Sequence, residues 1–158
     1  MQPTLLNSCA RAATADEARF RIDRPIPGRS ARVIALDAEA AEVARRVADR
    51  PWSGATFHTA EGGDEVVLRA ADGSASPLSN ELLGADLAVI VATSDDGAQA
   101  ARAIALACAR LGVMMAGLIV GERLELNAAV AALRPYAPVL LISGDEDDLA
   151  ELLTALRA

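Results

Sequence analysis

Two apolar segments on either side of a long alanine-rich helix constrain the fold most strongly. The segment LAVIVAT at 87–93 is followed by a tight turn, by a predicted helix at 97–111 and by VMMAGLIV at 113–120. This succession is typical of a parallel β-α-β unit. Because both predicted strands are apolar on their two faces, we expect them at the centre of a parallel sheet that helices cover on both sides.

The rest of the chain continues the alternation of strands and helices. The strand predicted at 31–37 precedes a helix at 38–50, whose expected buried stripe is Ala40, Val43, Ala44 and Val47. Further strands are predicted at 55–60, 65–70 and 139–143, and further helices at 78–83 (capped by Ser76 or Ser79), 124–134 and 145–158. This order predicts an α/β fold with a three-layer, doubly wound, mostly parallel sheet of the Rossmann-like class.

The length and the apolar content suit one domain. The chain has 158 residues, of which 53% are hydrophobic, enough for a single sizeable core. Residues 31–158 are predicted to form this domain. Residues 1–30 are predicted to form an N-terminal arm, with a short helix in 1–19 and an edge strand at 19–23.

The charge and the cysteines exclude several classes of function. A net charge of −7 argues against binding to nucleic acid or to an anionic membrane, because such binders need a surplus of Lys and Arg. Cys9 and Cys108 lack the spacing of a metal site or a disulfide framework. No cofactor is expected. The chain shows no secretory leader and no uncharged segment of membrane-spanning length, which predicts a cytoplasmic protein.

Acidic turns at the predicted strand ends are the candidate ligand sites. In a doubly wound sheet, ligands bind where the winding reverses, here between the ends of the strands 31–37 and 87–93. The candidate ligand-binding residues are Asp37, Thr93, Ser94, Asp95, Asp96 and Gly97, with Ser143 and Gly144 in a second acidic turn. Two interpretations stay open for these turns. In the first interpretation Ser94 or Asp95 caps one following helix and Ser143 or Asp145 caps the last helix. In the second, the acidic residues bind Mg²⁺ or a polar ligand, and Asp37 joins the first turn.

A phosphate group fits the first turn poorly. A phosphate about 5 Å from one carboxylate meets roughly 3 kcal/mol of repulsion per charge pair at an effective dielectric constant of about 20. Asp95 and Asp96 would double this repulsion unless a metal intervened. The turn also lacks the glycine pattern of dinucleotide-binding and P-loop sites.

The predicted helix 97–111 is apolar almost all round, which indicates that something covers its outward face. Leu106 lies there between Arg102 and Arg110, and Ala103 permits close approach. We therefore expect a homo-oligomer or a protein partner to contact these four residues. In a symmetric dimer, Leu106 would be central and the arginines would lie at the rim.

The segment LLGADLAVIVATSDDGAQAARAIALACARLGVMMAGLIVGE resembles the central segment of tubulin/FtsZ-type GTPases. In that family a Gly-Ala-Asp precedes a strand, a glycine-rich phosphate loop, a helix that ends in Leu-Gly and a second strand. Residues 94–99 replace the phosphate loop, so only Gly97 corresponds to it, and Asp37 is followed by Ala38 rather than by a glycine-rich first loop. The resemblance implies a relative that kept the scaffold and lost the nucleotide.

Together these features predict a non-catalytic, Rossmann-like module that acts through self-association or a protein partner. The alternative is a Mg²⁺-dependent enzyme, or a binder of nucleotides or other small molecules, that uses the acidic crevice at the strand ends.

Overall fold

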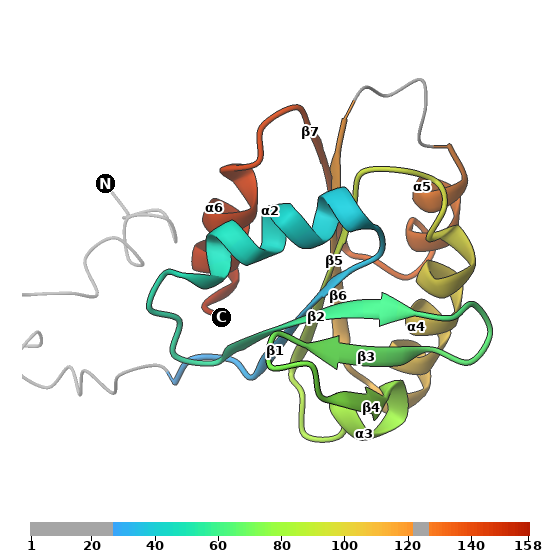
Figure 1. Ribbon diagram of the computed structural model, residues 1–158, viewed down its shortest axis with the longest axis horizontal. Coiled ribbons are helices and arrows are strands. Elements are labelled where there is room, and N and C mark those ends of the chain that lie inside the picture. The colour runs from blue at the N-terminus through green and yellow to red at the C-terminus, as the bar shows by residue number, and fades with distance from the viewer. Residues whose placement is uncertain (1–26, 122–126) are drawn as a thin grey trace, which may run out of the picture.

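A single seven-stranded sheet organises the chain (Figure 1). The computed structural model describes residues 27–121 and 127–158. The strand order is β4-β3-β2-β1-β5-β6-β7. The helix and edge strand predicted within 1–23 lie outside the described residues. The strands are β1 Ala31–Ala35, β2 Ala55–Glu61, β3 Val67–Ala70, β4 Ala75–Pro77, β5 Leu87–Ala92, β6 Met114–Val120 and β7 Val139–Ser143.

The sheet is mixed but mostly parallel. β2, β1, β5, β6 and β7 run parallel, whereas β3 and β4 form an antiparallel extension beyond β2. β1 lies between β2 and β5, so the chain winds outward in opposite directions from β1. The mixed α/β class and the predominance of parallel pairing are as predicted.

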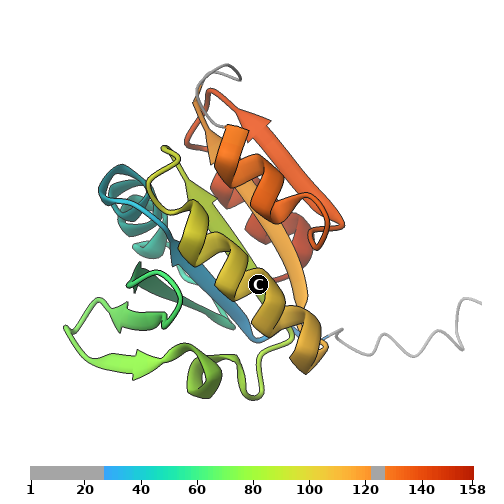
Figure 2. The ribbon, with the colours of Figure 1, turned by 90° about the vertical axis from the view of Figure 1, so that its right-hand side faces the viewer.

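Helices cover both faces of the sheet, which gives two apolar cores. The bounds are α2 Ala38–Ala48, α3 Leu78–Leu82, α4 Ala98–Leu111, α5 Asn127–Leu133 and α6 Asp148–Leu156. α2 and α6 pack on one face, and α3, α4 and α5 pack on the other (Figures 1 and 2). β5 faces both cores, because Leu87 and Val89 belong to the α2–α6 core and Ala88 and Ile90 to the other. Every residue of β5 is buried, as its apolar sequence predicts.

Two helices follow their sequence signals closely. The four residues of the predicted α2 stripe are the buried residues of this helix, and Asp37 caps it by accepting a hydrogen bond from the Ala40 N–H. α4 ends at Gly112, which has a φ of 69° and donates its N–H to the Cys108 carbonyl. A residue with a side chain would be strained in this left-handed conformation.

The structure corrects several predicted bounds. Ser76 and Pro77 belong to β4 rather than to a helix start, and α3 has no side-chain cap. The reason is the turn before β4, in which the Asp72 carboxylate accepts from the Ser74 N–H. This turn lets residues 75–77 pair with β3 as an antiparallel hairpin. Pro77 is tolerated there because β4 is an edge strand. α6 begins at Asp148, later than predicted, and the predicted start of α5 at 124 lies outside the described residues.

Within the described residues, no helix has the length and apolar character needed to cross a membrane.

Candidate functional site

Asp37 lies where β1 and β5 end, and its carboxylate holds the two ends together. Oδ2 accepts from the backbone N–H groups of Thr93 at 2.8 Å and Ser94 at 3.1 Å. Oδ1 accepts from the Thr93 hydroxyl and from the Ala40 N–H. The structure therefore brings together three of the predicted site residues. These hydrogen bonds use both carboxylate oxygens of Asp37, and all their donors belong to the protein itself.

The electrostatics of Asp37 agree with a structural carboxylate. Its partial burial by itself would raise its pKa, but the hydrogen bonds from the Thr93 hydroxyl and from three backbone amides outweigh that effect and hold the pKa below its ordinary value. Asp37 is thus held in its ionised form by donors that belong to the protein itself.

Asp95 serves a different helix from the one predicted. We expected Ser94 or Asp95 to cap α4, but the N-cap of α4 is Gly97 and makes no side-chain bond. Asp95 Oδ1 instead accepts from the Ala129 N–H in the first turn of α5, at 2.9 Å. The capping prediction was wrong because α5 lies at the same edge of the sheet as the start of α4, and the Asp95 carboxylate accepts from a backbone N–H of α5 instead. Asp96 is exposed, and its N–H donates to the Ser94 hydroxyl.

Gly97 is required for packing. A Cβ at this position would lie 2.5 Å from the Leu36 Cβ and 2.8 Å from the Leu36 carbonyl oxygen. The start of α4 therefore approaches the end of β1 too closely for any side chain. This close packing explains why position 97 holds a glycine.

Ser143 and Gly144 lie at the end of β7, two strands away from β5. The Ser143 hydroxyl donates to the Asp148 carboxylate and accepts from the Asp145 N–H, and Asp145 in turn accepts from the Asp147 N–H. The predicted capping of α6 by Ser143 or Asp145 is wrong, because the N-cap is Asp147 and it makes no side-chain bond. This turn is held by bonds among its own residues and the first turn of α6.

The strand ends also border an open cavity of about 600 Å³ next to Thr93. Its polar lining comes from α2 and from the turn before α6. Arg46 forms an ion pair there with Glu146, and Glu39 and Glu42 line the α2 side. Within 27–121 and 127–158, no group of three or more His, Cys, Asp or Glu side chains is arranged to hold a metal ion.

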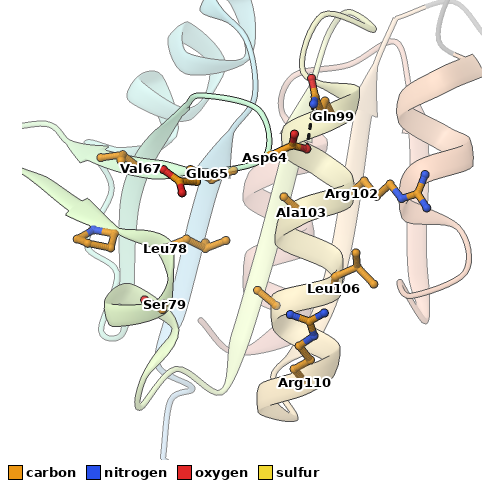
Figure 3. A pocket seen from close by; sticks show the side chains of 13 residues that line it. Asp64, Glu65, Val67, Leu78, Ser79, Gln99, Arg102, Ala103, Leu106 and Arg110 are labelled. Atoms are coloured by element: carbon orange, nitrogen blue, oxygen red, sulfur yellow. Dashed lines mark hydrogen bonds between the residues drawn. The ribbon is translucent and has the colours of Figure 1, made fainter.

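The outward face of α4 borders a second hollow, which we call the α4 groove (Figure 3). It lies between α4 and the segment that forms the β2–β3 loop, β3, β4 and α3, and its volume is about 600 Å³. Ala103 and Leu106 line it from α4, and Leu78 lines it from α3. Ala103 packs against the core on this side of the sheet, whereas Leu106 is half-buried and belongs to neither core cluster of the described residues.

Charged groups frame the α4 groove. At its upper end in Figure 3, the Gln99 side chain donates to Asp64 of the β2–β3 loop at 2.9 Å. Glu65 follows Asp64 along the same rim, and Arg110 lies at the opposite end. Arg102 extends away from the hairpin and also lines a neighbouring hollow between α4 and α5. The groove thus combines an apolar floor with acidic and basic ends.

Sequence reasoning found the α4 side of this groove but missed its other wall. Asp64 falls between the predicted strands 55–60 and 65–70, and Leu78 falls at the start of the predicted helix 78–83. No local pattern indicates that the loop reaches α4, because Asp64 and Gln99 are 35 residues apart. Gly63 lies beside this contact, because a Cβ there would lie 2.8 Å from Oε1 at the flexible end of the Gln99 side chain.

No family model matches the chain, and no curated protein sequence matches it. Among solved structures, the chain is similar to proximal thread matrix protein 1 from the mussel byssus, with a TM-score of 0.46 and 12% sequence identity. The match covers 80% of this chain and 44% of that protein, so the chain spans less than half of its length. A likeness of this size leaves the function to be argued from the geometry above.

Proposed function

We propose that the protein is a non-catalytic module that acts by associating with a second copy of itself through the α4 groove. The observation that carries this proposal is the placement of Leu106, a half-buried apolar side chain beside an apolar groove with charged ends. An apolar centre with a polar rim is the usual anatomy of a protein–protein contact.

The charges of the groove are complementary to each other. Asp64 lies beside the start of α4, and Arg110 lies near its end. If α4 meets the α4 of a second copy in antiparallel fashion about a twofold axis, each Arg110 approaches the acidic rim of the other copy. The same symmetry places the two Leu106 side chains against each other at the centre. A second copy therefore satisfies both the apolar and the charged parts of the groove.

The contacts at the strand ends support a role without catalysis. The Asp37 carboxylate accepts four hydrogen bonds within the fold, and Asp95 holds the first turn of α5. A Mg²⁺ ion would have to replace donors that these carboxylates already have. The alternative function, a Mg²⁺-dependent enzyme or small-molecule binder, would therefore use the cavity beside Thr93 and Glu39 rather than Asp37.

We assign the sheet to the Rossmann-like class because its parallel strands wind outward from β1 in both directions. A scaffold shared with tubulin/FtsZ-type GTPases and a cytoplasmic location remain predictions from the sequence.

The experiment compares Leu106→Glu with the parent by light scattering at micromolar concentration. We expect the parent to have a higher mass than a monomer. We expect Leu106→Glu to have a lower mass than the parent, because it loses the association through the α4 groove, and to keep the circular dichroism spectrum of the parent. Leu111→Glu is the matched control. It makes the same change at an exposed leucine of α4 that does not line the groove, and we expect it to associate like the parent. Equal masses for the parent and Leu106→Glu would refute the proposal.

A further inference from the structure

The two edges of the sheet differ in how they resist pairing with another chain. β4 has only three residues, and Pro77 in it has no N–H to donate. Short edge strands and edge prolines are common means of preventing edge-to-edge association. β7, at the opposite edge, has five residues, VLLIS, and contains neither a proline nor a charge. Within the described residues, no strand pairs with its outer side.

The side chains of β7 are also unusually exposed for its composition. Val139 and Leu141 keep 40% and 39% of their surfaces accessible. Both point to the same face of the sheet, because residues two apart in a strand share a face. Figure 2 shows β7 as the outermost strand, in orange-red, beside β6. This edge thus offers backbone groups and apolar side chains together.

The register decides which backbone groups point outward. The Ser143 carbonyl accepts from the Gly121 N–H, on the β6 side. In a parallel ladder the N–H and C=O of one residue point to the same side and alternate along the strand. The backbone N–H and C=O groups of Val139 and Leu141 therefore point toward β6, like those of Ser143. The backbone groups of Leu140 and Ile142 point to the outer side of β7, where no strand pairs with them in the described residues.

We propose that β7 pairs with β7 of a second copy in antiparallel fashion, with Leu141 on the twofold axis. Leu140 of each copy then faces Ile142 of the other, and their outward N–H and C=O groups form two reciprocal pairs of hydrogen bonds. The two Leu141 residues form a non-hydrogen-bonded pair whose exposed side chains cover each other. This register satisfies all outward backbone groups of these residues at once.

The charges at the two ends of β7 favour this antiparallel occupant. Arg134 is exposed before the strand, and Asp145 is exposed on the turn after it. Antiparallel pairing brings the start of each strand next to the end of the other, so each Arg134 approaches the acidic turn of the second copy. Parallel pairing would instead place the two acidic turns side by side.

The proposed pairing can be tested by disulfide crosslinking at single positions. Non-hydrogen-bonded antiparallel pairs have Cα atoms about 4.5 Å apart, within the range that a disulfide spans. Leu141→Cys should therefore form a disulfide-linked dimer under mild oxidation. A thiol reductant should convert this dimer back to the monomer. The variants are made with Cys9→Ser. Cys108 can stay, because its thiol is buried and burial raises its pKa to about 11.

Val139→Cys is the matched control on the same strand, with nearly the same exposure. In the proposed register the two copies of position 139 lie four residues apart, which is about 14 Å at 3.4 Å per residue, too far for a disulfide. We expect a crosslinked fraction at least about tenfold higher for Leu141→Cys than for Val139→Cys. Equal crosslinking at the two positions, or none at position 141, would overturn the inference.

This inference shares its occupant, a second copy, with the proposed function but uses a different surface, and the two can fail separately. Leu106→Glu added to Leu141→Cys should leave the crosslinked fraction unchanged, because position 106 lies on α4 and not on β7. A loss of crosslinking in that double variant would overturn β7 as an independent contact. If Leu106→Glu leaves the mass unchanged while position 141 still crosslinks, the proposed function fails and the β7 pairing stands.

Discussion

The turns at the strand ends and the outward surfaces of α4 and β7 differ in what their side chains contact. The turns contain the most charged residues, yet Asp37 and Asp95 accept hydrogen bonds from backbone groups of their own chain. Leu106 and Leu141 carry no charge, yet Leu106 is only partly buried and Leu141 keeps 39% of its surface accessible within the described fold. The comparison teaches that polarity at a strand end is weak evidence of a ligand when the fold itself supplies the donors.

The largest expected effect breaks the network at the strand ends. Asp37→Ala should lower the free energy of unfolding by about 2–4 kcal/mol, because it removes a helix cap and leaves the N–H groups of Thr93 and Ser94, just after β5, without acceptors. Urea denaturation of the parent and of Asp96→Ala provides the comparison; Asp96 is exposed, and its removal should change the stability by less than about 0.5 kcal/mol. If Asp37→Ala were instead more stable than the parent, the Asp37 carboxylate would lower the stability of the fold, which would indicate that it has a role in function.

A smaller effect is the dependence of stability on pH. It concerns His58, a buried polar residue away from the turns at the strand ends. His58 is buried, and its ring contacts the Thr56 hydroxyl at 3.0 Å. Burial lowers the pKa of His58 below 6.5; Glu81 nearby acts to raise it, and Arg32 to lower it further. In the unfolded chain His58 binds a proton near pH 6.5, whereas in the folded chain it binds that proton only at a lower pH. This part of the stability is complete above pH 6.5 and decreases as the pH falls from there toward the folded-state pKa.

Urea midpoints at pH 7.5 and 5.5 measure this dependence. His58→Gln removes the titrating group, so the difference between the two midpoints should be smaller in the variant than in the parent. An equal difference in both proteins would assign the pH dependence to other groups.

The smallest expected effect is an absence of ligand stabilisation. Thermal melting with Mg²⁺, GTP, ATP or their combinations should leave the melting temperature unchanged, since we expect no nucleotide binding tighter than about 1 mM. A ligand present at 100 times its dissociation constant would add about 2.7 kcal/mol. A clear rise with Mg²⁺ and a nucleotide would reverse the comparison and favour the enzyme alternative.

Much of the fold could be predicted because its signals are local. The stripe and the Asp37 cap of α2 lie within a dozen residues of each other, and the continuous apolar composition of β5 and β6 indicates burial on both faces. The β4 strand was missed because its pairing depends on the Asp72 turn and on β3, while Ser76-Pro77 resembles a helix start when taken alone.

What the sequence by itself determined is the order of the described elements apart from β4, the central parallel strands and the residues on the outward face of α4. Each follows from the period of apolar residues and from the turn chemistry over a few positions. Only the tertiary structure decided that Asp37 joins Thr93, that Asp95 serves α5, and that Asp64 closes the α4 groove. These partners are 56, 34 and 35 residues apart. A polar side chain binds whichever donor the folded chain brings within about 3 Å, and that choice is made by the packing of helices on the sheet rather than by neighbours in the sequence.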